Sequence, residues 1–289
     1  MTFADSPSRN SPAWRYREAD HPHIVPVPAF SDNYIWLVGL DNRAGERQAL
    51  VVDPGDAAPV LAALESQQMP LAHILITHHH ADHTGWIAGL KEAWPEAVVH
   101  GPRKCVNRFI ERRYDHGDRL VIDELGLEAQ VIEVPGHTLD HNAYFCPRLG
   151  DDPRPVLFCG DTLFAGGCGR VFEGTPAVML ESLERLARLP PQTLVYCAHE
   201  YTLSNLRFAR TAEPANDAVA ARLAEAGSVR AQDKATVPSS IGVELETNPF
   251  LRPTSAGIRD TLLGRAAIDG ADRVAIFAAL REWKNEFRG

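Results

Sequence analysis

The sequence of 289 residues lacks any apolar run near the ~18–20 residues that span a bilayer. Residues 1–20 also lack the apolar stretch of a secretory signal, and we expect them to form a flexible N-terminal arm. Positive charge is in deficit, with 29 Lys and Arg against 38 Asp and Glu and a formal net charge of −9. We therefore expect no membrane partner and no nucleic-acid partner.

Cysteine is scarce, and its spacing does not suggest pairing. The chain has five cysteines, an odd number, and no CxxC motif. This pattern argues against a disulfide framework and against a Cys-rich structural zinc site. We expect the cysteines to be buried as small apolar residues, and a cytoplasmic location fits them best.

Strand-length apolar segments bounded by turn residues recur over about residues 23–200. We expect strands at His23–Phe30, Tyr34–Val38, Ala49–Val52, Ala72–Thr77, Val98–Gly101, Gln130–Val134, Asn142–Phe145, Pro155–Cys159 and Thr193–Cys197. A helical pattern lies between them at Met179–Leu189. Mixed strands and helices over this length predict stacked sheets flanked by helices.

The pattern changes after residue 200. Leu203–Thr211, Asn216–Ala226 and Ala256–Phe287 are rich in Ala, Leu and Arg and read as helical. Thr247-Asn248-Pro249 predicts a break, because Asn-Pro favours a turn. We expect a catalytic domain over residues 21–199 and a smaller all-α domain over residues 200–289.

A cluster of candidate metal ligands follows the strand predicted at Ala72–Thr77. The chain runs on as HHHADH over residues 78–83, and an extended segment points His78 and His80 to one side and His79 to the other. A turn through Ala81 would bring Asp82 and His83 back to the same pocket. Imidazole with carboxylate suits zinc, iron or manganese. The alternative is a surface His-rich tract that binds metal adventitiously.

Three further strand ends favour a true metal centre. His137, Asp161 and His199 each follow a predicted strand, and coincidence becomes improbable when such residues are added to the first cluster. The seven ligands exceed the four of one closed structural site. We therefore expect two metals, with Asp161 as the candidate for a shared carboxylate.

These motifs resemble the metallo-β-lactamase superfamily, whose pattern of THxHxDH, GHT, GD and a final His is matched in order. The resemblance is closer to the hydroxyacylglutathione hydrolase (glyoxalase II) family and extends from Ile24 to Phe287. The segments that carry it are PAFSDNYIWLV, VDPG, Thr77–Gly85, Pro135–Thr138, GDTLFAGGCGRVFEG, HEYT and Asn248-Pro249-Phe250.

The resemblance implies an α+β fold, an αββα sandwich followed by a smaller helical domain. It implies two divalent metal ions, zinc above iron or manganese. One metal would be bound by His78, His80 and His137, and the other by Asp82, His83 and His199, with Asp161 bridging. Asp82 and Asp161 would serve catalysis by holding the metals around a bridging hydroxide.

The substrate implied by the resemblance is a glutathione thioester, S-D-lactoylglutathione, cleaved to glutathione and D-lactate in the second step of methylglyoxal detoxification. The substrate-binding residues it points to are Arg170, Phe172, Tyr201, Arg281 and Lys284. Without the resemblance, Arg281 and Lys284 read as a solvated helix face, and Tyr201 as a packing residue. A thiolate leaving group, with a pKa of about 8.5, departs with little help from an acid.

The sequence departs from the family pattern at two notable positions. Phe172 stands where many relatives have a Tyr that hydrogen-bonds the peptide, so that contact is expected to be missing. Asp140 replaces the Gly usual before His141, which puts the local turn in doubt. Asp53 is expected to support the turn near the metal loop, and Cys168 is expected to be structural, because no base for a nucleophile is evident.

Competing functions remain at this point. A mononuclear-iron persulfide dioxygenase of the same superfamily is the nearest rival enzyme, and a non-enzymatic metal-binding protein is the rival outside enzymology. A β-lactamase leaves the helical tail without a role, and an RNA-processing nuclease is disfavoured by the net charge of −9. The expected partner is a small-molecule glutathione thioester, and the expected oligomeric state is a monomer.

Overall fold

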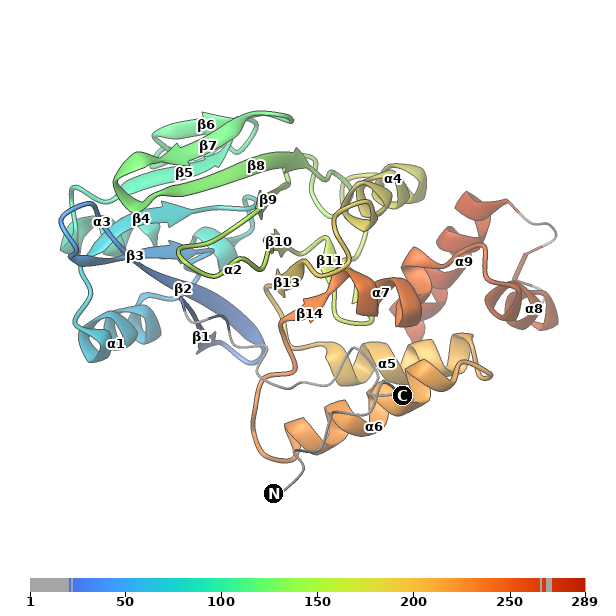
Figure 1. Cartoon of the computed structure of the whole chain (residues 1–289). Coiled ribbons are helices and arrows are strands. Elements are labelled where there is room, and N and C mark those ends of the chain that lie inside the picture. The colour runs from blue at the N-terminus through green and yellow to red at the C-terminus, as the bar shows by residue number, and fades with distance from the viewer. Residues whose placement is uncertain (1–20, 22, 266, 269–271, 289) are drawn as a thin grey trace, which may run out of the picture.

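The computed structural model describes residues 21, 23–265, 267, 268 and 272–288. These residues form two six-stranded sheets, flanked by helices, and a helical region that lies to one side of them (Figure 1). The expected α+β fold, an αββα sandwich followed by helices, is therefore confirmed. The arm expected at residues 1–20 lies outside the described residues.

The first sheet has the strand order β1-β2-β3-β4-β5-β6. Strands β1 to β3 pair antiparallel, whereas β3 to β6 pair in parallel. Parallel neighbours need crossover connections, which α1 provides between β3 and β4, and α2 with α3 between β4 and β5. The elements are β1 (Ile24–Ala29), β2 (Asn33–Asp41), β3 (Arg47–Val52), α1 (Ala57–Gln67), β4 (Leu71–Leu75), α2 (Ala81–Thr84), α3 (Ile87–Ala93), β5 (Val98–Pro102) and β6 (Arg112–Tyr114).

The second sheet has the order β14-β13-β10-β9-β8-β7, and only its β10–β13 pair is parallel. Helix α4 makes that crossover and packs between the second sheet and α9. A short hairpin, β11 with β12, follows β10. The elements are β7 (Arg119–Ile122), η1 (Asp123–Leu125), β8 (Leu127–Glu133), β9 (Asn142–Cys146), β10 (Val156–Gly160), β11 (Leu163–Phe164), β12 (Gly167–Cys168), α4 (Pro176–Ala187), β13 (Leu194–Cys197) and β14 (Ser239–Ser240).

The core lies between the facing sheets, and β2 shows how they are joined. All of β2 except its last residue is buried, because the second sheet covers one face and α1 covers the other. Trp36 of β2 meets Tyr196 of β13 edge to face, with ring centroids 4.8 Å apart. Its indole N–H donates to the Cys197 carbonyl at 3.0 Å, so a buried polar group is satisfied across the two sheets.

The helical region follows β13. Its elements are α5 (Thr202–Ala212), α6 (Asp217–Arg230), α7 (Ile241–Thr247), η2 (Pro249–Leu251), α8 (Ala256–Gly264) and α9 (Arg273–Glu286). Asn216 caps α6 by accepting from the Val219 N–H, as its position before a helical run predicted. The break predicted at Thr247-Asn248-Pro249 is confirmed, since α7 ends at Thr247.

The other expected elements are present with some corrections. All nine predicted strands exist, with ends that differ by up to three residues. The sequence did not predict β6 and β7, which carry exposed arginines. It also did not predict β11, β12 and β14, which have two residues each. The helical stretch expected over residues 256–287 is two helices, because Asp272 accepts from the Val274 N–H and starts α9 anew. Among the described residues, no helix has both the length and the apolar character to cross a bilayer.

A buried ion pair joins the helical region to the β11–β12 hairpin. Arg222 of α6 and Glu244 of α7 lie 2.6 Å apart with side chains 1% and 0% exposed. The other Glu244 oxygen accepts from the Gly166 N–H at 2.8 Å, in the turn of the hairpin. This carboxylate therefore holds two helices and the hairpin together.

We predict that Glu244→Ala lowers the free energy of unfolding by about 3–5 kcal/mol, because it leaves the Arg222 charge buried without its carboxylate. The matched control is Glu181→Ala, which removes an exposed pair with Arg185 on α4 and is expected to cost less than about 0.5 kcal/mol. Urea unfolding followed by circular dichroism measures both. Equal costs for the two variants would contradict the structural role assigned to Glu244.

Candidate functional site

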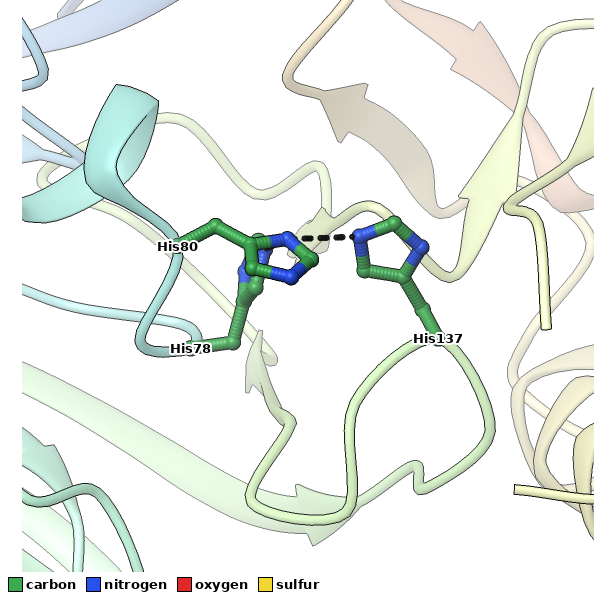
Figure 2. Close-up of side chains that lie close together, drawn as sticks. All are labelled: His78, His80 and His137. Carbon is green, nitrogen blue, oxygen red and sulfur yellow. Dashed lines mark hydrogen bonds between the residues drawn. The ribbon is translucent and has the colours of Figure 1, made fainter. Parts of the chain in front are cut away.

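Residues 76–80, called the metal loop here, connect the end of β4 directly to α2. His78 and His80 point to the same side, and His78 Nε2 and His80 Nδ1 lie 3.0 Å apart. His137, from the loop after β8, brings its Nε2 to 3.0 Å from the same His80 nitrogen. Figure 2 shows these three imidazoles converging from the two loops. They form the first ligand group.

A second group lies beside the first. The first turn of α2 returns Asp82 and His83 to the site, and the loop after β13 supplies His199. The Asp82 Oδ2 atom is 3.4 Å from His83 Nε2 and 3.5 Å from His199 Nε2. The sequence placed these residues in one pocket, and the structure brings them together.

Asp161 lies between the two groups. Its Oδ2 is 3.3 Å from His137 Nε2 in the first group, and its Oδ1 is 3.3 Å from His199 Nε2 in the second. Gly160 makes this position possible, because its φ of 46° is left-handed and a Cβ there would lie 2.4 Å from the Thr77 hydroxyl. The sharp turn at the end of β10 thus aims Asp161 into the site.

The electrostatics of the cluster are dominated by buried charge. Burial opposes a charge on His83, but the Asp161 and Asp53 carboxylates outweigh it and raise its pKa well above the usual value. Burial also opposes a charge on Asp161, yet His83 and His199 hold the pKa of its carboxyl well below the usual range. Positive charge is therefore favoured on His83 and His199, whereas burial lowers the pKa of His78, His80 and His137.

The donors of the site fit divalent cations. His83 Nε2 and Asp161 Oδ1 are buried and have no hydrogen-bond partner among the described residues. Metal-binding histidines typically give their second nitrogen to an oxygen acceptor. This pattern recurs here, with His83 Nδ1 3.0 Å from Asp53 and His137 Nδ1 3.0 Å from the Arg170 carbonyl. Nitrogen and carboxylate donors suit zinc, iron or manganese.

A cavity of about 530 Å³ opens from these groups. Its lining joins the metal loops to the helical region. The lining residues are His80, Asp82, His137, Asp161, Phe164, Cys168, Arg170, Phe172, His199, Tyr201, Ser204, Asn205, Arg281, Lys284, Asn285 and Phe287. All five residues that the resemblance assigned to the substrate therefore line one cavity with five of the seven candidate metal ligands.

The part of the cavity lined by α9 is positively charged. Arg281 of α9 is 7% exposed and donates to the Cys168 carbonyl at 2.8 Å, which fixes its guanidinium. Lys284, one turn later, donates to the Ser204 hydroxyl at 2.8 Å. Burial, followed by repulsion from Arg281 and Arg170, lowers the pKa of Lys284 to about 8. The acidic chain thus has a local site for an anion.

Two aromatic rings lie beside the two ligand groups. Tyr201 stacks on His199 with centroids 4.8 Å apart and planes within 5°. Phe172 is 60% exposed, and its ring lies 5.2 Å from His137 and 5.9 Å from His80. The Phe172 side chain has no hydroxyl, so it offers an apolar contact at this position.

The turn containing Asp140 is stabilised by His79. The His79 Nδ1 atom lies 2.9 Å from Asp140, and its Nε2 lies 3.6 Å from Glu173. Glu173 in turn accepts from the Leu139 N–H at 2.7 Å. His79 therefore points away from the two ligand groups, as its position predicted, and links two loops that border the cavity.

Asp53 and Cys168 have the surroundings that were expected. Asp53 accepts from the Thr77 N–H at 2.8 Å and lies 3.0 Å from His83, so it supports the metal loop. Cys168 is buried in the short hairpin, and burial raises the pKa of its thiol. All five cysteines are buried and free, which agrees with the sequence.

Several residues near the site were missed. Asp32, Asn33 and His141 contact ligand residues, and Ser204 and Asn205 line the cavity. Burial lowers the pKa of His141 to about 3, so its neutral Nε2 accepts from the Asp161 N–H at 3.1 Å. Asp32 precedes the buried strand β2 and Asn33 begins it, and polar residues at a strand end were the signal available for them.

Two family models match adjacent parts of the chain, and their matches meet between residues 199 and 200. The family model of the metallo-beta-lactamase superfamily matches residues 30–199, and that of the hydroxyacylglutathione hydrolase C-terminus matches residues 200–287. Among solved structures, ETHE1 from Myxococcus xanthus is similar with a TM-score of 0.59 and 24% identity, covering 90% of this chain and 97% of that one. BLEG-1 B3 metallo-beta-lactamase has a TM-score of 0.56 and 21% identity, covering 79% of this chain and 99% of that one. Both likenesses concern the fold alone.

Curated relatives are much more similar in sequence. A hydroxyacylglutathione hydrolase from Albidiferax ferrireducens is 51% identical, over 91% of this chain and 99% of its own length. One from Pseudomonas aeruginosa is 49% identical over the same shares. The two family models and these relatives show that the chain belongs to the hydroxyacylglutathione hydrolase family of the metallo-beta-lactamase superfamily.

Proposed function

We propose that this enzyme hydrolyses S-(2-hydroxyacyl)glutathione, with S-D-lactoylglutathione as its substrate, to glutathione and a 2-hydroxy acid. One observation carries the proposal: a single cavity joins the two ligand groups to the cationic end formed by Arg281 and Lys284. The relatives that share about half of its sequence are named for this reaction. In the cell, the activity would be the second step of methylglyoxal detoxification.

The ligand groups suggest how two divalent metals are held. His78, His80 and His137 would hold one metal, and Asp82, His83 and His199 the other, with Asp161 shared between them. We propose zinc, with iron and manganese as the alternatives that the same donors accept. Bound cations of this kind lower the pKa of a water to about 7 and offset negative charge that develops on a carbonyl oxygen.

The other residues of the cavity would bind and orient the substrate. Glutathione carries two carboxylates, and Arg281, Lys284 and Arg170 supply positive charge for them. The ring of Phe172 would pack on the substrate, and Tyr201 would border the reacting end. The departing thiolate needs no strong acid, so Asp82 and Asp161 are free to remain ionised ligands.

The remaining assignments follow from the same proposal. We place the catalytic domain at residues 21–199 and the helical substrate-binding domain at residues 200–289, in line with the family models. We propose that the protein is a monomer, because the candidate ligands and the cationic residues of the cavity lie on the same chain. A cytoplasmic location is supported by the five unpaired cysteines.

The direct test measures thioester cleavage and metal content of the purified protein. We expect hydrolysis of S-D-lactoylglutathione with about two metal ions per chain. Oxygen uptake with glutathione persulfide, without thioester cleavage, would support a persulfide dioxygenase instead. Bound metal without hydrolysis of any thioester, lactam or phosphodiester would support a non-enzymatic metal-binding protein.

We predict that His137→Ala and Asp161→Ala each lower kcat/KM by more than about 100-fold, since replacing even a residue behind a ligand typically costs 10–100-fold. The loss is expected to coincide with reduced metal content, measured by elemental analysis of the same samples. The matched control is His116→Ala, an exposed histidine outside the cavity. Near-normal activity with full metal content in either variant would refute the ligand assignment.

We predict that Arg281→Ala and Lys284→Ala raise KM for the glutathione thioester by roughly 10–100-fold, because each removes a charge-assisted hydrogen bond worth about 1.5–3 kcal/mol. Steady-state kinetics measure the effect. Lys104→Ala removes a lysine whose partner is Glu133 outside the cavity, and its KM is expected to match that of the unmodified enzyme. An unchanged KM in both cavity variants would make their role structural.

The lowered pKa of Lys284 gives a pH-dependent prediction. A lysine with a pKa of about 8 is charged below that pH and loses its charge as pH rises, so KM is expected to increase between about pH 7 and pH 9. Lys284→Arg keeps the charge over this range, because the guanidinium pKa exceeds 12. The substrate's own amine titrates equally in both assays. A KM ratio between the two enzymes that does not change with pH would refute the assignment.

A further inference from the structure

The segment from Phe30 to Tyr34, which leads from β1 into the start of β2, lies directly against the second ligand group. Phe30 has a left-handed φ of 51° and turns the chain at the end of β1. Beyond it, the Tyr34 N–H donates to the Ala198 carbonyl at 2.7 Å, and the Glu200 N–H donates to the Asp32 carbonyl at 2.9 Å. These backbone bonds flank His199, so the position of the segment does not depend on its side chains.

Two adjacent side chains of this segment reach two ligand residues. Asp32 Oδ1 lies 2.8 Å from His199 Nδ1. Asn33 donates from its amide to Asp82 Oδ2 at 3.1 Å. Both contacts belong to the second group, and in the described part of the chain neither side chain is hydrogen-bonded to His78, His80 or His137.

The chemistry of each contact sets the direction of a lone pair. A carboxylate that accepts from Nδ1–H of His199 selects the tautomer whose Nε2 lone pair would be available to a cation in the second group. The Asn33 amide donates to Asp82 Oδ2. The same oxygen lies 3.4 Å from His83 Nε2 and 3.5 Å from His199 Nε2. Asn33 therefore holds Asp82 in the orientation that brings the second group together.

The two groups are supported differently. His83, Asp82 and His199 are each held by a separate side chain, from Asp53, Asn33 and Asp32 respectively. In the first group, His137 is held by the backbone carbonyl of Arg170, and His78 by the Thr77 hydroxyl at 3.0 Å. A change at Asp32 or Asn33 therefore acts on one group and leaves the support of the other in place.

We propose that Asp32 and Asn33 are positioning residues for one metal ion only, the ion held by Asp82, His83 and His199. This inference rests on the proposed two-metal function. It predicts that the two metal positions are separable by changes outside the ligands. Loss of an oxygen or amide partner behind a ligand typically weakens metal binding by 10–100-fold.

The test is a metal titration of the full chain. Unmodified enzyme, Asp32→Ala, Asn33→Ala and the double variant are stripped with a chelator and dialysed against buffered free Zn²⁺, and bound zinc is counted by elemental analysis. We expect two dissociation constants in the unmodified enzyme. In each variant one of them should be unchanged and the other weaker by 10–100-fold. The double variant should still keep one ion.

Matched variants separate positioning from a general effect on the fold. Ser31→Ala removes an exposed hydroxyl that donates to Asp32 Oδ2 at 3.0 Å, and both of its dissociation constants are expected to be unchanged. Asp32→Asn keeps an acceptor oxygen for His199 and is expected to recover part of the affinity that Asp32→Ala loses. Thermal unfolding in excess chelator should give similar Tm values for Asp32→Ala and the unmodified protein.

The outcomes distinguish this inference from the function on which it rests. Two unchanged constants in Asp32→Ala, or an equal weakening of both constants, would overturn the positioning role while the two-metal function stands. Loss of both ions from the double variant would overturn it as well. An unmodified enzyme that binds no pair of zinc ions would overturn both proposals, and this result is visible before any variant is titrated.

Discussion

The buried carboxylate of Asp161 lies between two groups of ligands, and the surrounding loops are arranged around its charge. A carboxylate taken out of water is costly unless positive charge or hydrogen bonds compensate it. Imidazole nitrogens approach each of its oxygens at 3.3 Å, one from each group. Cations held by the same imidazoles would balance this charge. Burial of the Asp161 carboxylate therefore depends on ligand residues from both groups.

Strand ends make that set possible. β4, β10 and β13 each end beside the site, and the ligands that follow them come from segments spread over more than 100 residues of the chain, from His78 to His199. The sheets are joined by apolar packing and by the Trp36 hydrogen bond to β13, which keeps the loops in register. Packing between the two sheets thus brings the ligand loops together, which no local sequence preference could do.

The helical region supplies Arg281 and Lys284 of α9, the positively charged part of the cavity lining. Arg281 reaches the short hairpin through the Cys168 carbonyl, and Glu244 reaches the turn of the same hairpin through the Gly166 N–H. The hairpin thus connects the residue that bridges the ligand groups to the helices that supply positive charge. The positions of Arg281 and Lys284 relative to Asp161 are consequently fixed by packing between the two parts of the chain.

The sequence by itself determined the nine main strands, the change to helices after residue 200 and the residues that gather at the site. These features depend on local patterns: apolar runs, turn residues, and His or Asp at the ends of strands. Only the tertiary structure decided that Asp32 and Asn33 support one ligand group, that His141 accepts from the Asp161 N–H, and that Arg281 is buried rather than solvated. Each of these contacts joins residues at least 20 positions apart, and their positions depend on how the sheets and helices pack.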